Sequence, residues 1–198
     1  MQIAILDYGV GNLYSLSCAL KKLKVTPQIV TSVKGNFDGV VLPGVGAFDA
    51  VTKSLGGNRS RILDVAESGT PLLGICLGMQ LMFESSEEGK GKGLSIFKGS
   101  VKKLPSKVKL PHMGWNLLDK RGEPEILEGL SDKSWVYFLH SFYSDPKDKR
   151  IIASTTIHGK KFTSTISHKN IFGTQFHPEK SGGVGSVILK NFLKTCKK

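Results

Sequence analysis

The chain has 198 residues, 39% of them hydrophobic and 22% charged, so we interpret residues 1–198 as a single soluble globular domain. No apolar run reaches the roughly 18 residues of a membrane span, and the first residues lack the basic leader of a secretory signal, which predicts a cytoplasmic protein without a membrane partner. The net charge of +12 comes from lysines spread along the chain without interleaved aromatic residues, so we expect no nucleic-acid partner.

Short apolar runs and helical patterns alternate in the first half of the chain. The predicted strands are Gln2–Leu6, Pro27–Val30, Gly39–Leu42 and Pro71–Ile75. The predicted helices cover residues 13–23, capped by Asn12, then 49–66 with an interruption at 56–57, and 77–83. This alternation predicts a parallel sheet that is covered by helices on both sides.

The pattern changes after the glycine- and lysine-rich segment 89–109, to which we assign no element. The densest run of lysines, from Lys98 to Lys109, predicts a solvated face, with attraction to an acidic protein or a phosphorylated metabolite as the alternative. Short β-rich runs follow at Trp135–His140, Ile151–Ile157, Phe162–Ser167 and Ile171–Phe176, and a final helix covers about 185–196. The predicted fold class is α/β, with a central, mostly parallel sheet flanked by helices and an additional β-rich portion in the C-terminal half.

The three cysteines are widely spaced. Cys18, Cys76 and Cys196 form no C-x-x-C pair, which argues against a zinc site or a disulfide framework. We expect no metal and no cofactor. Each cysteine is therefore a free thiol that acts either as core filler or as a nucleophile, and we interpret Cys18 and Cys196, both in predicted helices, as filler.

Cys76 is the candidate nucleophile. The segment Gly74-Ile75-Cys76-Leu77-Gly78 has the pattern G-x-C-x-G between a predicted buried strand and a predicted helix. This is the thiol counterpart of the G-x-S-x-G elbow, in which flanking glycines let neighbouring segments come close to a sharp turn. The N-terminal end of the following helix favours the thiolate. A small buried cysteine in a glycine-flanked turn is the alternative.

A thiol nucleophile needs an imidazole base, and the chain has five histidines. His177 is favoured because it follows a predicted strand and precedes Pro178 and Glu179. In an extended segment, residues i and i+2 project to the same side, so Glu179 could fix the tautomer of His177. A surface histidine beside a carboxylate is the alternative. His140 is the second choice as base, and we interpret His112, His158 and His168 as non-catalytic.

The elbow Gly74–Gln80 and the segment Phe176–Glu179 together resemble the class I glutamine amidotransferases. The resemblance spans nearly the whole chain. It implies a flavodoxin-like sheet, a triad of Cys76, His177 and Glu179, a γ-glutamyl thioester intermediate, and delivery of ammonia to a synthase partner. Segments 7–12, 43–48 and 112–116 narrow the resemblance to the glutaminase subunits of imidazole glycerol phosphate synthase, which act in histidine biosynthesis.

That resemblance implies roles for further residues. The oxyanion would be held by the backbone N–H of Leu77 and by one N–H from the loop that contains Val45 and Gly46. The substrate-binding residues would be Gln80, Glu88, His140 and Ser141. Glu88 could instead be a solvated charge. Phe142 stands where relatives often have tyrosine, which puts a hydroxyl contact there in doubt.

The implied partner is a (β/α)8-barrel cyclase, with which the chain would form a heterodimer. The interface positions implied by the resemblance are Asn12, Trp115, Tyr137 and Lys180, although Trp115 could equally be a core residue. Three other functions stay open at this point: a paralogous glutaminase that serves another synthase, for example in surface-sugar amidation, a non-catalytic docking subunit, and a peptidase or esterase.

Overall fold

A computed structural model describes residues 1–9 and 11–197, which leaves Val10 of segment 7–12 and Lys198 outside the description. Its centre is an eight-stranded sheet with the order β2-β1-β3-β4-β13-β12-β11-β8. The strands are β1 (Ile3–Leu6), β2 (Gln28–Val30), β3 (Gly39–Leu42), β4 (Leu72–Ile75), β8 (Asp119–Lys120), β11 (Ile152–His158), β12 (Lys160–His168) and β13 (Ile171–Thr174). The first five in spatial order are parallel, and the last three are antiparallel.

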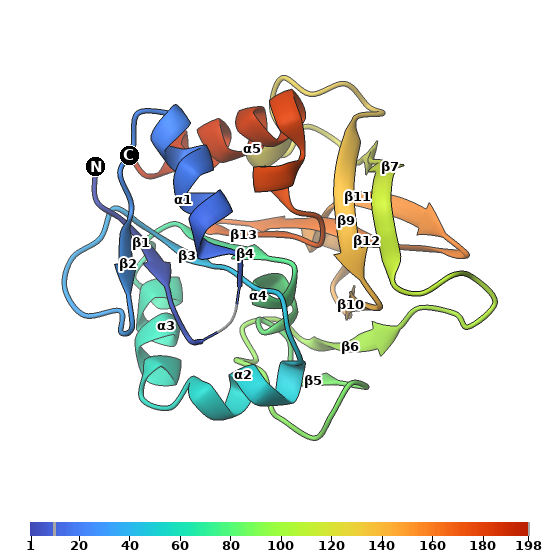
Figure 1. Ribbon diagram of the computed structural model, residues 1–198, viewed down its shortest axis with the longest axis horizontal. Helices are drawn as coiled ribbons and strands as arrows, with labels where there is room; N and C mark the ends of the chain where they lie inside the picture. The colour runs from blue at the N-terminus through green and yellow to red at the C-terminus, as the bar shows by residue number, and fades with distance from the viewer. Residues whose placement is uncertain (10, 198) are drawn as a thin grey trace.

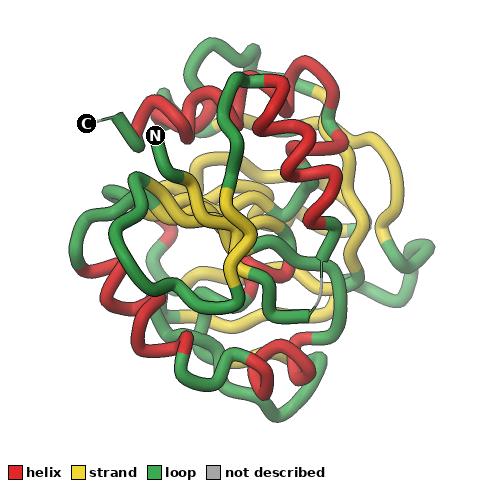
Figure 2. Tube along the Cα trace, turned by 60° about the vertical axis from the view of Figure 1, so that its left-hand side comes forward, coloured by secondary structure: helices red, strands yellow, loops and turns green. Residues whose placement is uncertain are grey.

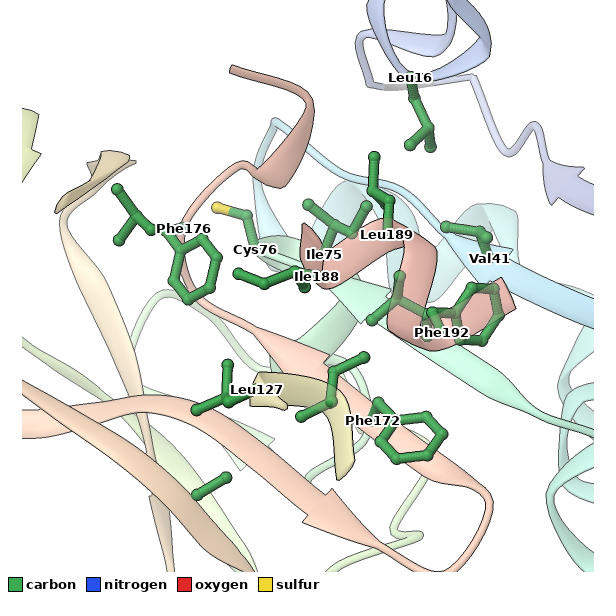
Figure 3. Close-up of a cluster of buried hydrophobic side chains, with 14 of the residues drawn as sticks. Leu16, Val41, Ile75, Cys76, Leu127, Phe172, Phe176, Ile188, Leu189 and Phe192 are labelled. Carbon is green, nitrogen blue, oxygen red and sulfur yellow. The ribbon is translucent and has the colours of Figure 1, made fainter. Parts of the chain in front are cut away.

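Helices cover both faces of the parallel part of the sheet (Figures 1 and 2). The helices are α1 (Leu13–Lys22), α2 (Phe48–Ser54), α3 (Asn58–Glu67), α4 (Leu77–Gln80) and α5 (Gly182–Thr195). Alternate residues of each strand point to opposite faces, so Ile3 and Ile5 pack with α1 and α5, whereas Ala4 and Leu6 pack with α2 and α3. The first of these clusters includes Leu16, Phe172, Ile188 and Phe192 and reaches Cys76 (Figure 3). The predicted fold class is confirmed.

Two smaller β units lie beside the main sheet, and most of their strands come from the C-terminal half of the chain. One contains β5 (Ser85–Ser86), β6 (Gly99–Lys103) and β10 (Phe142–Pro146), and the other is an antiparallel ribbon of β7 (His112–Leu117) and β9 (Trp135–His140). The described residues also form three short 3-10 helices: η1 (Glu125–Leu127), η2 (Lys149–Ile151) and η3 (Pro178–Lys180). Among the described residues, no helix has both the length and the apolarity that crossing a membrane requires.

One predicted helix is shorter than expected, and one segment without an assigned element contains a strand. The helix expected over 77–83 ends at Gln80, because the following carbonyls bond elsewhere: Leu81 O accepts from Leu94 N, and Met82 O accepts from Phe97 N. The segment 89–109, to which no element was assigned, contains β6. This strand pairs with β10 from Gly99↔Pro146 to Lys103↔Phe142.

Candidate active site

The candidate site lies where three neighbouring parallel strands end. β4 pairs with β3 on one side and with β13 on the other, so their carboxyl ends lie together, which is where open α/β sheets bind ligands. The loop 43–46 follows β3, Cys76 follows β4, and His177 lies three residues after the end of β13. The Cys76 N–H donates to Thr174 O at 2.6 Å. The topology therefore brings the candidate nucleophile and the candidate base to one edge of the sheet.

Cys76 occupies a strained turn between β4 and α4. Its backbone angles are φ 52° and ψ −104°, and a positive φ at a residue other than glycine costs on the order of 1–3 kcal/mol. The turn is tightly enclosed, because a Cβ on Gly78 would lie 1.9 Å from Leu42 O and one on Gly74 would lie 2.6 Å from Met79 N. The strand, sharp turn and helix that the G-x-C-x-G pattern predicts are all present.

His177 and Glu179 form a buried pair. Nδ1 of His177 lies 2.8 Å from Oε1 of Glu179, and the two side chains are only 2% and 4% exposed. The prediction assumed that residues 177–179 are extended. In the structure, Pro178 instead begins the 3-10 helix η3. The i, i+2 contact is therefore made across a helical turn. The burial also rules out the alternative of a surface histidine.

The other nitrogen of His177, Nε2, is the one available to Cys76. It is buried without a hydrogen-bond partner, and the Cys76 sulfur is near enough to interact with the ring electrostatically. Burial lowers the pKa of His177, but the Cys76 thiolate and the Glu179 carboxylate outweigh burial and raise this pKa to about 10. The site therefore favours the imidazolium form of His177.

A pocket of about 300 Å³ opens beside Cys76. It is lined by every residue predicted to hold the oxyanion or the substrate, namely Val45, Gly46, Leu77, Gln80, Glu88, His140 and Ser141. A larger hollow of about 560 Å³ beside Arg61 and Asp64 has neither cysteine nor histidine in its lining. The chemistry therefore favours the smaller pocket.

Two polar side chains of the pocket are fixed by backbone groups. Glu88 Oε2 accepts from Phe48 N at 2.8 Å, at the start of α2, so the alternative of a merely solvated charge is wrong. Gln80 is 4% exposed, and its Nε2 donates to Phe142 O at 2.9 Å. This contact uses a backbone carbonyl, so it does not need the tyrosine hydroxyl that relatives often have at position 142.

His140 is bonded in a way that removes it as a base. Its Nδ1 lies 2.7 Å from Phe142 O, which can only accept, and its Nε2 lies 3.1 Å from Nδ1 of His112. The His112 ring stacks on that of His158 with centroids 4.1 Å apart. Three of the four other histidines thus form one cluster behind the pocket wall. The remaining one, His168, is exposed in β12 beside the ring of Phe97.

The family model described as glutamine amidotransferase class-I matches residues 4–196. This chain belongs to that family. Relatives named imidazole glycerol phosphate synthase subunit HisH include those of Bacillus cereus, 48% identical over 197 residues that cover 96% of this chain and 93% of the relative, and of Pyrococcus furiosus, 47% identical with 98% of each covered. The relative of the same name from Trichormus variabilis is 46% identical over 202 residues, covering 96% of this chain and 94% of its own.

Solved structures agree on the fold of this amidotransferase. PurLQS from Thermotoga maritima superposes with a TM-score of 0.77 at 17% identity, covering 98% of this chain and 97% of its own. A glutamine amidotransferase from the same organism gives a TM-score of 0.67 at 18% identity, with coverage of 99% and 81%. At these identities the likeness concerns the fold alone.

Sequence reasoning missed two residues near the site of this amidotransferase. Gln175 is fully buried, and its Nε2 lies 3.5 Å from the sulfur of Cys76. His112, interpreted only as non-catalytic, is a buried member of β7 that bonds to His140. The position of Gln175 in the chain, between β13 and His177, could have indicated its role. Because β13 runs parallel to β4, the residues that follow β13 lie beside Cys76, which follows β4.

Three of the four predicted interface residues, the exposed Trp115 and the half-buried Tyr137 and Lys180, form one patch at the surface, which we call the aromatic patch. Trp115 is 53% exposed, so the alternative of a core residue is wrong. Its ring meets that of Tyr137 across the β7–β9 ribbon at 6.1 Å, and Lys180 Nζ lies 5.8 Å from the Tyr137 ring. Asn12 is not part of it; its Oδ1 caps α1 by accepting from Ser15 N at 3.1 Å.

Proposed function

We propose that this chain hydrolyses glutamine to glutamate and ammonia through a thioester on Cys76, and that it supplies the ammonia to a cyclase subunit of imidazole glycerol phosphate synthase. The observation that carries the proposal is the convergence on one pocket. The strained Cys76 and every predicted substrate and oxyanion residue line this pocket, and the buried His177, which is bonded to Glu179, interacts with the same thiol. The names of the relatives support the choice of synthase.

In the first half of the reaction, the thiolate of Cys76 attacks the side-chain amide carbon, and the electron pair of the C=O double bond moves to oxygen. The Nε2–H of His177 protonates the amide nitrogen as the C–N bond breaks. Ammonia leaves, and a γ-glutamyl thioester remains. Glu179 holds the imidazole in one tautomer and stabilises its charged form throughout.

In the second half, water attacks the thioester carbon and gives a proton to Nε2 of His177. The tetrahedral intermediate collapses with cleavage of the C–S bond, which releases glutamate and restores the thiolate of Cys76. The tetrahedral intermediate of each half carries an oxyanion. The Leu77 N–H suits this charge because it is the first residue of α4 and has no intrahelical acceptor, and the Val45–Gly46 backbone lines the same pocket. One such donor is worth about 3 kcal/mol of barrier.

The aromatic patch is the surface on which the cyclase would dock, and we expect this partner to be a (β/α)8 barrel. An exposed tryptophan beside a half-buried tyrosine and a cation is typical of binding hot spots. The patch is also connected to the site, since Tyr137 O accepts from His177 N at 2.9 Å. A partner that docks there would contact β9, the strand whose backbone is hydrogen-bonded to His177. We expect Asn12 to contribute at the rim and the complex to act in the cytoplasm.

The test measures ammonia release from glutamine by the purified chain, alone and with the candidate cyclase and its nucleotide substrate. We expect low activity alone and a large rise in the complex. Cys76→Ala should abolish release while the complex still forms, and Cys18→Ala, a half-buried thiol on α1, is the matched control that should leave the rate unchanged. Ammonia release by the Cys76→Ala complex at the unsubstituted rate would reject the proposed function.

A further inference from the structure

We propose that Gln175 is a positioning residue for the nucleophile: its side-chain amide donates a hydrogen bond to the sulfur of Cys76 and holds it as thiolate facing the pocket. This inference rests on the proposed function, because it concerns the same thiol. It assigns a role to a residue that belongs neither to the His177–Glu179 pair nor to the pocket lining, and it rests on contacts among buried side chains.

Gln175 is held from two sides. Its Nε2 lies 3.5 Å from Cys76 Sγ, and its Oε1 lies 3.2 Å from Nε2 of Gln80. Its backbone N–H donates to Ser164 O at 2.9 Å, so the main chain is tied to β12 as well. The side chain has no exposed surface. A buried amide that is bonded at both ends has one orientation, and water does not compete for it.

The direction of these hydrogen bonds follows from one carbonyl. Phe142 O can only accept, so the Gln80 atom 2.9 Å away must be the amide nitrogen. That nitrogen also faces Gln175, which must therefore present its oxygen to Gln80 and its NH₂ group to Cys76. The Phe142 carbonyl thus determines that the Gln175 side chain turns its nitrogen, and not its oxygen, toward the sulfur.

The same carbonyl also fixes the histidine cluster. His140 Nδ1 must donate to Phe142 O, so His140 Nε2 accepts from His112 Nδ1, and His112 Nε2 accepts from Asn116 Nδ2 at 3.1 Å. The two lone pairs of Phe142 O are thereby used by His140 and Gln80. Gln175 is consequently the inner end of a polar framework whose other end is anchored in the β7–β9 ribbon.

The second neighbour of the sulfur shows why a donor is needed. Cys76 Sγ lies 3.7 Å from Leu139 O, an acceptor that favours the protonated thiol and repels the thiolate. His177 Nε2 is not hydrogen-bonded to the sulfur in this structure. The Gln175 amide is therefore the hydrogen-bond donor that offsets the Leu139 carbonyl before substrate arrives. Because hydrogen bonds to charged groups are stronger than those to neutral groups, this donor favours the thiolate.

The experiment measures the rate of alkylation of Cys76 by iodoacetamide as a function of pH, read on the Cys76 peptide by mass spectrometry. It uses the full chain and needs neither glutamine turnover nor a partner. Gln175→Met keeps the length of the side chain and removes the donor. We expect the midpoint of its profile to move to higher pH by about one unit, which is a roughly tenfold lower thiolate fraction below the midpoint. Gln175→Glu, which replaces the donor by an acceptor, should move it further.

Two controls separate positioning from general damage. Ser144→Ala removes another fully buried polar group, a hydroxyl without a partner, and should leave the midpoint unchanged. Gln80→Met leaves Gln175 in place but frees its amide to rotate, so it should shift the midpoint in the same direction by less. It also provides the test if Gln175→Met fails to fold. An unchanged midpoint in folded Gln175→Met, or in Gln80→Met if only that variant folds, overturns the inference.

The outcome is distinguishable from that of the proposed function. Shifted midpoints in a chain that never releases ammonia would support the role of Gln175 and reject the glutaminase. Normal ammonia release with unshifted midpoints would do the reverse. In an active complex, Gln175→Met should lower kcat about tenfold with little change in KM, since the side chain does not line the pocket.

Discussion

His112 and His140, which are buried and bonded to each other, predict a loss of stability in mild acid. Burial and the neighbouring His158 lower the pKa of His112 to about 4. Burial lowers the pKa of His140 to about 3, although its contact with the Phe142 carbonyl acts in the opposite direction. Both rings are therefore neutral in the folded chain at pH 5, whereas a histidine in the unfolded chain, with a pKa near 6.5, is protonated there.

The sign and size of the change in the free energy of unfolding follow from the number of protons that each state binds. Between pH 6.5 and pH 5 the unfolded chain binds more protons than the folded chain, so the free energy of unfolding falls as the pH falls. Each histidine contributes 1.36 kcal/mol per pH unit over this window, or about 2 kcal/mol at pH 5. The pair together contributes about 4 kcal/mol, a large share of the 5–15 kcal/mol that stabilises a typical domain.

The assay is urea unfolding at pH 7.5 and pH 5.0 in a Cys76→Ala background. This background removes the thiolate that raises the pKa of His177, a histidine whose effect has the opposite sign because its stabilisation is complete below pH 6.5 and lost toward pH 10. The comparison is with the double variant His112→Asn/His140→Asn. It should lose about 4 kcal/mol less between the two pH values than its parent, and each single variant about half of that. Equal losses in all four chains would refute the reasoning.

Three further predictions concern the elbow, the triad and the patch. Gly78→Ala should abolish ammonia release and lower the urea midpoint, because the new Cβ would meet the carbonyl of Leu42 at 1.9 Å; a fully active variant would contradict the tight packing. Glu179→Gln keeps a hydrogen-bonding group beside His177 but removes its charge, so kcat should fall by roughly 10²–10⁴ in steady-state assays, and a fall below twofold would exclude the orienting role. Trp115→Ala should weaken cyclase binding by about 2 kcal/mol in calorimetry without changing alkylation of the thiol, and undiminished affinity would place the interface elsewhere.

The parallel part of the fold could be predicted because each central strand is a short, wholly apolar run between turns. Gly39–Leu42 was predicted to the residue, and β1 and β4 to within one residue. Of the smaller β units, β9 was predicted to the residue, whereas β5, β6, β7 and β10 were not predicted. β6 has the sequence GSVKK, whose lysines suggest a solvated segment, and its partner β10 lies far along the chain. Half-buried strands of this kind are defined by long-range pairing, which a local pattern does not contain.

The residues of the candidate site likewise fall into those that a local motif predicts and those that only long-range pairing reveals. Cys76, His177 and Glu179 were predicted because each belongs to a short motif whose chemistry demands those residue types. Gln175 was missed because a glutamine at the end of a strand has no local signature. Only the register Ile75↔Thr174 brings it beside the sulfur. The bond between His112 and His140 likewise depends on their pairing across the β7–β9 ribbon.

Covalent trapping tests the central claim most directly. A glutamine analogue with a chloroketone in place of the side-chain amide offers the nucleophile a carbon from which it displaces chloride, and peptide mass spectrometry locates the adduct. The account predicts one adduct per chain, on Cys76, formed more slowly in Glu179→Gln and prevented by excess glutamine. An adduct that forms on Cys18 or Cys196 while Cys76 stays unmodified, or labelling that glutamine does not slow, would contradict it.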